Sequence, residues 1–184
     1  MENSSNLILD IVKQTIDFYT KYLKIPEIDD IKIKDTSFFE KKWCVFVTIY
    51  KNGEIRWWAW NIKELKESIV FEIIENTIEA ISKDTRFSAL KLDEIKDLKI
   101  RVDIIKQRKI LKEKEIFSVD PIKNWIIAIK NDYSTMTTIL PNIGPLLLEW
   151  KDFIPVLEEK MKIPKFVEED FIIYVIETEV INNF

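Results

Sequence analysis

Residues 43–60 read WCVFVTIYKNGEIRWWAW, and this stretch decides the fold. Asn52-Gly53 lies between two runs rich in β-branched and aromatic residues. Asn-Gly in that setting is the preferred sequence of a two-residue type I′ hairpin. We therefore predict an antiparallel hairpin with strands over residues 43–50 and 54–60 and with Asn-Gly at its tip.

The second strand of this hairpin carries the most unusual residues of the chain. Strand alternation predicts two sets of side chains on opposite faces, Ile55, Trp57 and Ala59 on one and Arg56, Trp58 and Trp60 on the other. Two tryptophans beside an arginine are typical of an energetically dominant patch in a protein interface. The same rings would also suit stacking on a base or planar ligand, or simple packing in the core. All three interpretations stay open at this point.

Helices and strands are interspersed around the hairpin. Apolar spacing predicts helices over residues 6–23, 62–82 and 150–161, and strands over 99–105, 125–129, 135–140 and 171–180. Residues 106–115 are expected to be a solvated charged stretch. Because most strands follow one another without a helical crossover, the sequence predicts an α+β fold, a mainly antiparallel sheet flanked by helices. A small second lobe around the hairpin is compatible with this pattern.

The composition excludes several kinds of chemistry. The chain has 184 residues, no histidine and one cysteine, Cys44. It therefore lacks a Ser-His-Asp or Cys-His pair, an intrachain disulfide and a cysteine-cluster metal site. Gly53 and Gly144 stand far apart, so no glycine-rich phosphate loop is present. Carboxylate pairs such as Asp93 and Glu94 fit a solvated face better than an active site. No cofactor is expected, and Cys44 is predicted to be a buried, unreactive thiol.

Charge and hydropathy bear on partners and location. The net charge of −4 disfavours a nucleic-acid partner. The sequence has no apolar run of about 18 residues and no positively charged start to a signal peptide, so we expect a cytoplasmic protein without a membrane span. The abundance of Ile, Lys and Glu and the scarcity of Gln and Cys give an archaeal-like composition. That composition fits a thermophile, although an AT-rich genome would also enrich Ile and Lys.

Several motifs occur in the order in which one family has them. Residues 44–49 and 52–56, Cys-Val-Phe-Val-Thr-Ile and Asn-Gly-Glu-Ile-Arg, resemble the Phe-Val-Thr-Leu and Lys-x-Gly-x-Leu-Arg hairpin of the AMMECR domain. Further similar segments are 84–87 (Asp-Thr-Arg-Phe), 93–103, 139–143 (Ile-Leu-Pro-Asn-Ile) with Trp150, and the last strand. Each motif is weak by itself, whereas five in the same order are specific. The resemblance implies an AMMECR-type α+β fold, as a single domain over residues 5–181.

The chain departs from this family at its most characteristic hexapeptide. Where the family has Leu-Arg-Gly-Cys-Ile-Gly, residues 55–60 are Ile-Arg-Trp-Trp-Ala-Trp. Trp58 stands at the cysteine position, and it offers neither a nucleophile nor a metal ligand. Tryptophan also denies the close backbone approach that glycine permits. Any chemistry that the hexapeptide supports in the family is therefore expected to be lost or changed here.

Two arginines fall on motif positions in a chain with 24 lysines and four arginines. These are Arg56 and Arg86, and a planar guanidinium holds a carboxylate or carbonyls in a way that lysine does not reproduce. Either arginine would bind an anionic group of a ligand or partner, or it would form an internal salt bridge such as that of Arg86 with Asp84.

These observations favour a non-catalytic binding or adaptor protein that uses Arg56, Trp58, Trp60 and Arg86. The resemblance places it in a family associated with Memo-like and radical-SAM proteins. Its partner would be another protein or a second copy of the chain. One alternative is an enzyme with a relocated carboxylate site in a cleft near Arg86. The other is binding of nucleic acid or a planar ligand through Trp58 and Trp60.

Overall fold

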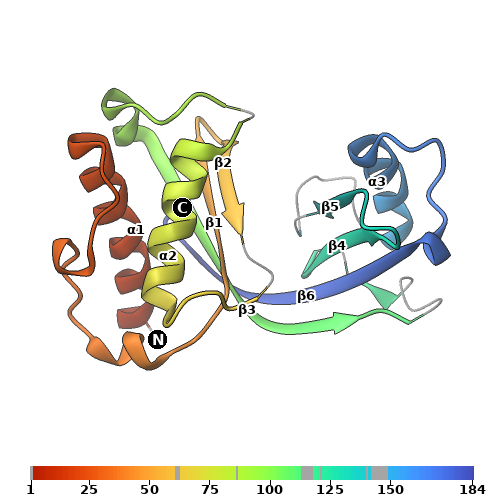
Figure 1. The fold of residues 1–184 in the computed structure, drawn as a ribbon, viewed down its shortest axis with the longest axis horizontal. Helices are drawn as coiled ribbons and strands as arrows, with labels where there is room; N and C mark the ends of the chain where they lie inside the picture. Colours follow the sequence, from red (N-terminus) through yellow and green to blue (C-terminus); the bar gives the residue numbers. More distant parts are fainter. Residues whose placement is uncertain are drawn as a thin grey trace. The chain divides into compact units, whose positions relative to one another are not determined.

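The computed structural model describes residues 2–60, 63–85, 87–112, 118–120, 122–139, 141 and 149–184. Over these residues the chain has the predicted α+β fold, a six-stranded antiparallel sheet with helices (Figure 1). The helices are α1 (Glu2–Tyr22), α2 (Ile69–Ile78) and α3 (Phe153–Met161). The strands are β1 (Val45–Lys51), β2 (Glu54–Trp60), β3 (Leu98–Ile110), β4 (Asn124–Lys130), β5 (Met136–Ile139) and β6 (Phe171–Asn182).

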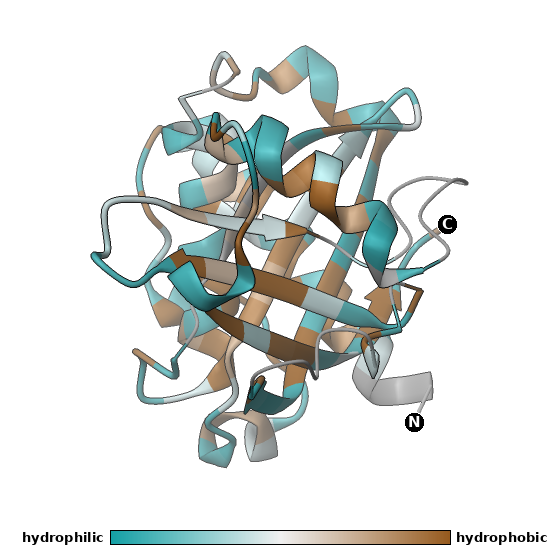
Figure 2. Cartoon of the chain, turned by 90° about the vertical axis from the view of Figure 1, so that its right-hand side faces the viewer, coloured by the Kyte–Doolittle hydropathy of each residue, from teal (hydrophilic) through white to brown (hydrophobic). Residues whose placement is uncertain are grey.

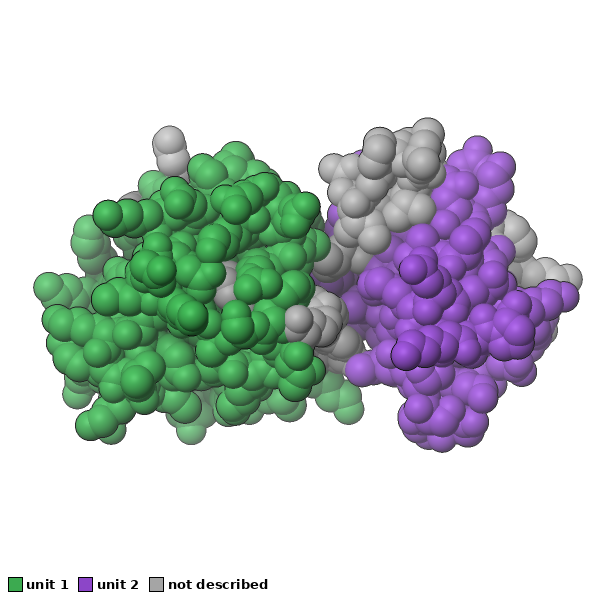
Figure 3. Space-filling model, turned by 90° about the horizontal axis from the view of Figure 1, so that it is seen from above, with its two compact units in different colours: residues 1–105, 179–184 green, residues 106–178 purple. Residues whose placement is uncertain are grey.

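The strands follow the order β2-β1-β3-β6-β4-β5. The chain divides into two compact units, unit 1 with residues 1–105 and 179–184 and unit 2 with residues 106–178 (Figure 3). The long strands β3 and β6 each contribute residues to both units. Figure 2 shows hydrophobic colour concentrated along the strands, whereas the helices alternate between hydrophobic and hydrophilic residues.

The hairpin predicted from Asn52-Gly53 is confirmed. Strands β1 and β2 pair antiparallel, and Lys51 and Glu54 form the last pair before the turn. Asn52 has φ 54° and Gly53 has φ 83°. Positive φ at both central residues is the signature of the type I′ turn, whose twist matches that of the flanking strands.

The predicted alternation along β2 is wrong at its first residues. The pairing moves from Ile49 with Trp57 to Tyr50 with Ile55, so that Arg56 lies opposite no residue of β1. This extra residue is a β-bulge, and a bulge reverses the alternation beyond it. Ile55 therefore shares the face of Tyr50, opposite to the face of Ala59, which pairs with Val47.

Unit 1 packs α1 and α2 against one face of β1 and β3. Its buried core includes Ile11 and Val12 of α1, Ile73 of α2, Val47 of β1 and Val102 of β3. Each of these side chains is fully buried. The helices thus cover the face of β1 that carries Val45, Val47 and Ile49, and they leave the alternate residues to the other face.

The helix predicted over residues 62–82 begins later than expected. Helix α2 starts at Ile69, and a π-helical turn, Glu79–Lys83, continues it. Glu72, although fully buried, accepts hydrogen bonds from the N–H groups of Leu65 (2.5 Å) and Lys66 (2.9 Å). These bonds hold residues 65 and 66 outside the helix. Leu65 is 64% exposed. Ile62 lies outside the described residues.

Unit 2 confirms the elements predicted for the second half of the chain. Strands β4 and β5 pair antiparallel, and α3 buries Phe153 and Leu157. Strand β3 continues to Ile110, so residues 106–110, expected as a charged stretch, are strand residues that stay exposed. In the part of the chain that the structure describes, no helix has the length and apolar character needed to cross a membrane.

Candidate functional site

The face of the unit 1 sheet that α1 and α2 do not cover carries polar groups. On β1 this face presents Phe46, Thr48 and Tyr50, which alternate with the helix-facing residues. Phe46 and Thr48 are each 1% exposed and Tyr50 is half-buried, so this part of the second face is largely closed to water. A buried sheet face with polar side chains is the natural place to look for a site.

Arg101 and Asp103 of β3 form the central ion pair of this face. Nε of Arg101 donates to Oδ2 of Asp103 and Nη2 donates to Oδ1, each at 2.7 Å. The Asp103 side chain has no exposed surface, and that of Arg101 is 16% exposed. Residues two apart on a strand point to the same face, so the planar guanidinium can grip both carboxylate oxygens.

Tyr50 lies beside this ion pair. Burial raises the pKa of its hydroxyl, and the nearby Arg101 opposes that shift without cancelling it. Burial also works against the charge of Arg101, but the hydrogen bonds and charge of Asp103 outweigh it and raise the pKa of the guanidinium. The ring of Tyr50 meets that of Phe184 edge to face, with centroids 5.3 Å apart. At neutral pH the site therefore presents a protonated phenol next to a permanent cation.

The register connects this cluster to the tryptophan positions of β2. Position 58 pairs with Thr48, which pairs in turn with Arg101 on its other side. Position 60 pairs with Phe46, which pairs with Asp103. The backbone thus aligns the positions of Trp58 and Trp60 with the two members of the ion pair. Their side chains lie outside the described part of the structure.

Arg56 is directed elsewhere. Its guanidinium carbon lies 4.9 Å from the ring centroid of Phe87, and Nη2 donates to the hydroxyl of Ser88 at 3.3 Å. Arg86, the other arginine singled out in the sequence, lies outside the described residues, and so does its suggested salt bridge to Asp84. The structure therefore brings Arg56 to the residues that follow position 86.

Glu94 adds a carboxylate near the hairpin. It accepts a hydrogen bond from Nζ of Lys51 at 2.5 Å and another from the N–H of Lys91 at 3.0 Å. The bond from Lys51, followed by that from Lys91, lowers the pKa of Glu94. Glu94 therefore stays ionised at neutral pH, which suits an anchor and does not suit a general acid.

Cys44 has the burial that an inert thiol requires. Its side chain has no exposed surface, and Sγ lies 3.4 Å from the carbonyl oxygen of Lys63. It precedes β1 rather than lying inside it, and its own carbonyl accepts the N–H of Ile105 at 3.0 Å. Its low reactivity stays a prediction. Among the described residues, no group of three or more Cys, Asp and Glu side chains could hold a metal ion.

Sequence reasoning missed Tyr50, Arg101 and Asp103 as a cluster. The available signal was an arginine and an aspartate two residues apart in a segment predicted as a strand. Alternation placed them on one face, but the sequence gives no indication that this face is buried.

The fold defines a class, an α+β domain with an antiparallel sheet, and in unit 1 helices cover one face of β1 and β3 while an arginine–aspartate pair lies on the other. The AMMECR1 family profile matches residues 9–181, and the chain belongs to this family. The resemblance read from the hairpin and the motifs after it is therefore confirmed.

Individual relatives support the assignment. A protein from Thermotoga maritima is 27% identical over 153 residues, which are 83% of this chain and 80% of that protein. Protein CA_C1420 from Clostridium acetobutylicum is 30% identical over 136 residues, which are 72% of this chain but 28% of that longer protein. The crystal structure of uncharacterized protein PH0010 from Pyrococcus horikoshii superposes with a TM-score of 0.79. The superposition covers 94% of this chain and 88% of the other at 20% identity, and it shows a shared fold.

Proposed function

We propose that this chain is a non-catalytic binding or adaptor protein, and that its binding surface follows strand β2. The candidate contact residues are Arg56, Trp58, Trp60 and Arg86. The observation that carries the proposal is the bulge at Arg56. Strand β2 ends the order of the described strands, and the bulge directs an arginine out of the hairpin register onto Phe87 and Ser88. Bulges on edge strands commonly serve to re-aim a side chain.

The chemistry of the chain supports binding over catalysis. The sequence has no histidine, and Trp58 replaces the cysteine of the family hexapeptide. The remaining thiol, Cys44, is buried. Glu94, a carboxylate near the hairpin, is engaged by Lys51. A planar, pre-positioned guanidinium next to aromatic residues is instead a common anchor in protein interfaces.

The partner in this proposal is another protein or a second copy of the chain. We treat residues 5–181 as one AMMECR-type domain that acts as a binding module. The matched region of CA_C1420 is 28% of that protein, as expected of a module that can be joined to other segments. A cytoplasmic location and a thermophilic source belong to the same proposal and rest on composition.

Comparison of two arginine variants tests the proposal. Arg56→Ala should weaken self-association, measured by sedimentation equilibrium, or cross-linking to a cellular partner by about tenfold or more, because interface arginines are often dominant anchors. Arg108→Ala, at an exposed position of β3, is the matched control and should leave association unchanged. Equal association of wild type and Arg56→Ala would contradict the proposal. Activity that depends on Glu94 would favour the enzyme alternative instead.

A further inference from the structure

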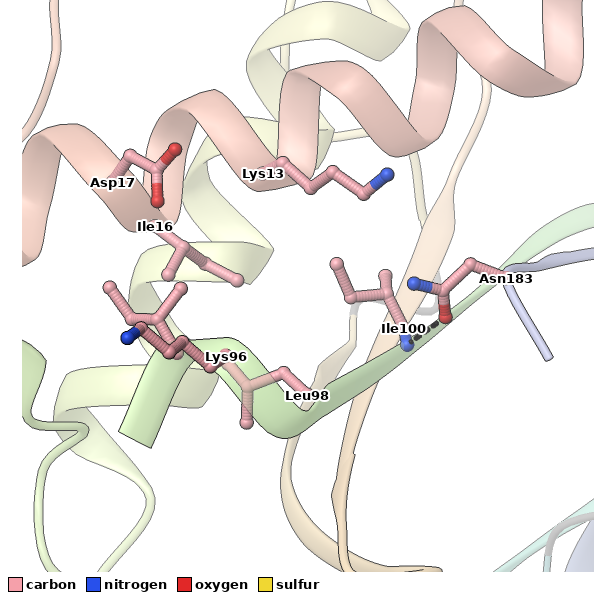
Figure 4. A pocket seen from close by; sticks show the side chains of 8 residues that line it. Lys13, Ile16, Asp17, Lys96, Leu98, Ile100 and Asn183 are labelled. Carbon is pink, nitrogen blue, oxygen red and sulfur yellow. Dashed lines mark hydrogen bonds between the residues drawn. The ribbon is translucent and has the colours of Figure 1, made fainter. Parts of the chain in front are cut away.

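Unit 1 contains a pocket of about 280 Å³ that is separate from the β2 surface. It lies between α1, the 3₁₀ turn Leu92–Asp97, the start of β3 and the residue after β6 (Figure 4). Four apolar side chains line it, namely Ile16, Ile95, Leu98 and Ile100. Its volume is close to the lower end of the range for small-molecule sites, which begins at about 300 Å³.

The polar groups of this pocket are unevenly distributed. Lys13 and Asn183 line one end, and Asp17 and Lys96 line the other (Figure 4). The opposite charges of Asp17 and Lys96 largely offset each other. At the first end, Lys13 is the charged residue that lines this pocket, and Asp10, Lys34 and Asp35 line a second pocket together with Lys13 and Asn183.

Asn183 is fixed in a defined orientation. Its Oδ1 accepts the N–H of Ile100 at 2.8 Å, and its own N–H donates to the carbonyl of Ile100 at 3.2 Å. Because Oδ1 is bonded to the strand, Nδ2 is the end of the amide turned toward the pocket (Figure 4). Within the described residues, neither Nδ2 of Asn183 nor the Lys13 ammonium donates to a protein acceptor. Two donors thus lie at the same end of an apolar pocket.

We propose that this pocket binds a small amphipathic monocarboxylate. The carboxylate would accept hydrogen bonds from Nζ of Lys13 and Nδ2 of Asn183, and the aliphatic part would lie on Ile16, Leu98 and Ile100. Charge-assisted hydrogen bonds from a lysine favour a carboxylate over a neutral oxygen. An apolar lining with a few convergent polar groups is the usual construction of a small-molecule site. The site shares no residue with the β2 surface, so the two proposals can fail independently.

Calorimetric titration with octanoate tests this assignment, with octanol and octylamine as probes of the same chain length. Octanoate should bind with a Kd below about 1 mM and shift the backbone NMR signals of Ile16, Leu98 and Ile100. Octanol and octylamine should bind at least about tenfold more weakly, because they offer the lysine no carboxylate.

Lys13→Met should reduce octanoate affinity by about tenfold or more while preserving the fold, because Lys13 is exposed. Lys21→Met, in the last turn of the same helix, is the matched control and should bind octanoate like wild type. The assignment is overturned by any of three results, namely no octanoate binding in this range, octanol binding as tight as octanoate, or equal affinity in Lys13→Met and wild type.

Discussion

The Asp103 carboxylate has no exposed surface, and both of its oxygens accept hydrogen bonds from one edge of the Arg101 guanidinium. A buried charge is tolerated only when it is paired, and removal of one partner leaves the other buried without compensation. Both partners lie on β3, so the pair holds two side chains of this strand in one arrangement more than it adds net stability. Across the sheet, Arg101 is aligned with position 58 and Asp103 with position 60. The ion pair is therefore linked to the part of β2 where this chain departs from the family motif.

The substitution Asp103→Asn tests this view of the ion pair. It should lower the free energy of unfolding by about 3 kcal/mol, because the arginine loses its buried counter-charge. Urea denaturation measures the change. The control is Glu149→Gln, which removes a carboxylate from an exposed pair with Lys151 and should have little effect. Similar small losses in both variants would show that the buried pair is not required.

Glu94 gives the molecule a specific pH dependence. Its pKa in the folded state is lowered below the ordinary value of 4.5 by Lys51 and the N–H of Lys91. A lowered folded-state pKa contributes stability that is complete above the unfolded pKa and is lost as pH falls through the folded pKa. The difference in unfolding free energy between wild type and Glu94→Gln should therefore be largest near neutral pH and shrink below about pH 4.5.

Unfolding curves of both proteins between about pH 3 and pH 7, a range that includes ordinary carboxyl pKa values, measure this difference. Introducing Lys51→Met into both backgrounds should remove most of the pH dependence. In the two proteins that retain Lys51, a difference in unfolding free energy that does not change with pH would contradict the ion pair.

At the scale of elements, the hairpin shows what local sequence determines. Asn52-Gly53 predicted the turn and its type, because two consecutive residues with positive φ need residues that tolerate it. The bulge at Arg56 was not predictable, because its cause is pairing with β1 and packing on Phe87, which are not local. The late start of α2 has a similar origin in the bonds from Glu72 to residues 65 and 66. Hydrophobic periodicity alone does not show that such bonds keep a segment with helical spacing outside the helix.

The substitution Gly53→Ala isolates the backbone contribution of the turn. An added Cβ at Gly53 would meet nothing within 4 Å, so its cost is the strain of φ +83° alone. We expect a loss of about 1 kcal/mol in unfolding free energy, measured by urea denaturation. Asn52→Gly, at φ 54°, is the matched control and should be close to neutral. A neutral Gly53→Ala would argue against the type I′ turn in solution.

At the scale of the whole molecule, the order and type of the elements were predictable from hydrophobic patterning, and the family resemblance covered nearly the whole chain. The candidate site was only partly predictable. Arg56 was identified from its rarity among lysines, whereas the pairing of Arg101 with Asp103 depends on a sheet face that long-range packing buries. Local patterns report which residues share a face, and only tertiary packing decides which faces are closed to water.

The central proposal is that Trp58 belongs to a binding surface rather than to the core. The most direct measurement combines urea unfolding with sedimentation equilibrium on wild type and Trp58→Ala. The reference is Trp125→Ala, because Trp125 is fully buried and its truncation should cost about 3–5 kcal/mol. If Trp58 belongs to the binding surface, Trp58→Ala should cost less than about 1 kcal/mol of unfolding free energy and should abolish association. A loss as large as that of Trp125→Ala, with association unchanged, would contradict it.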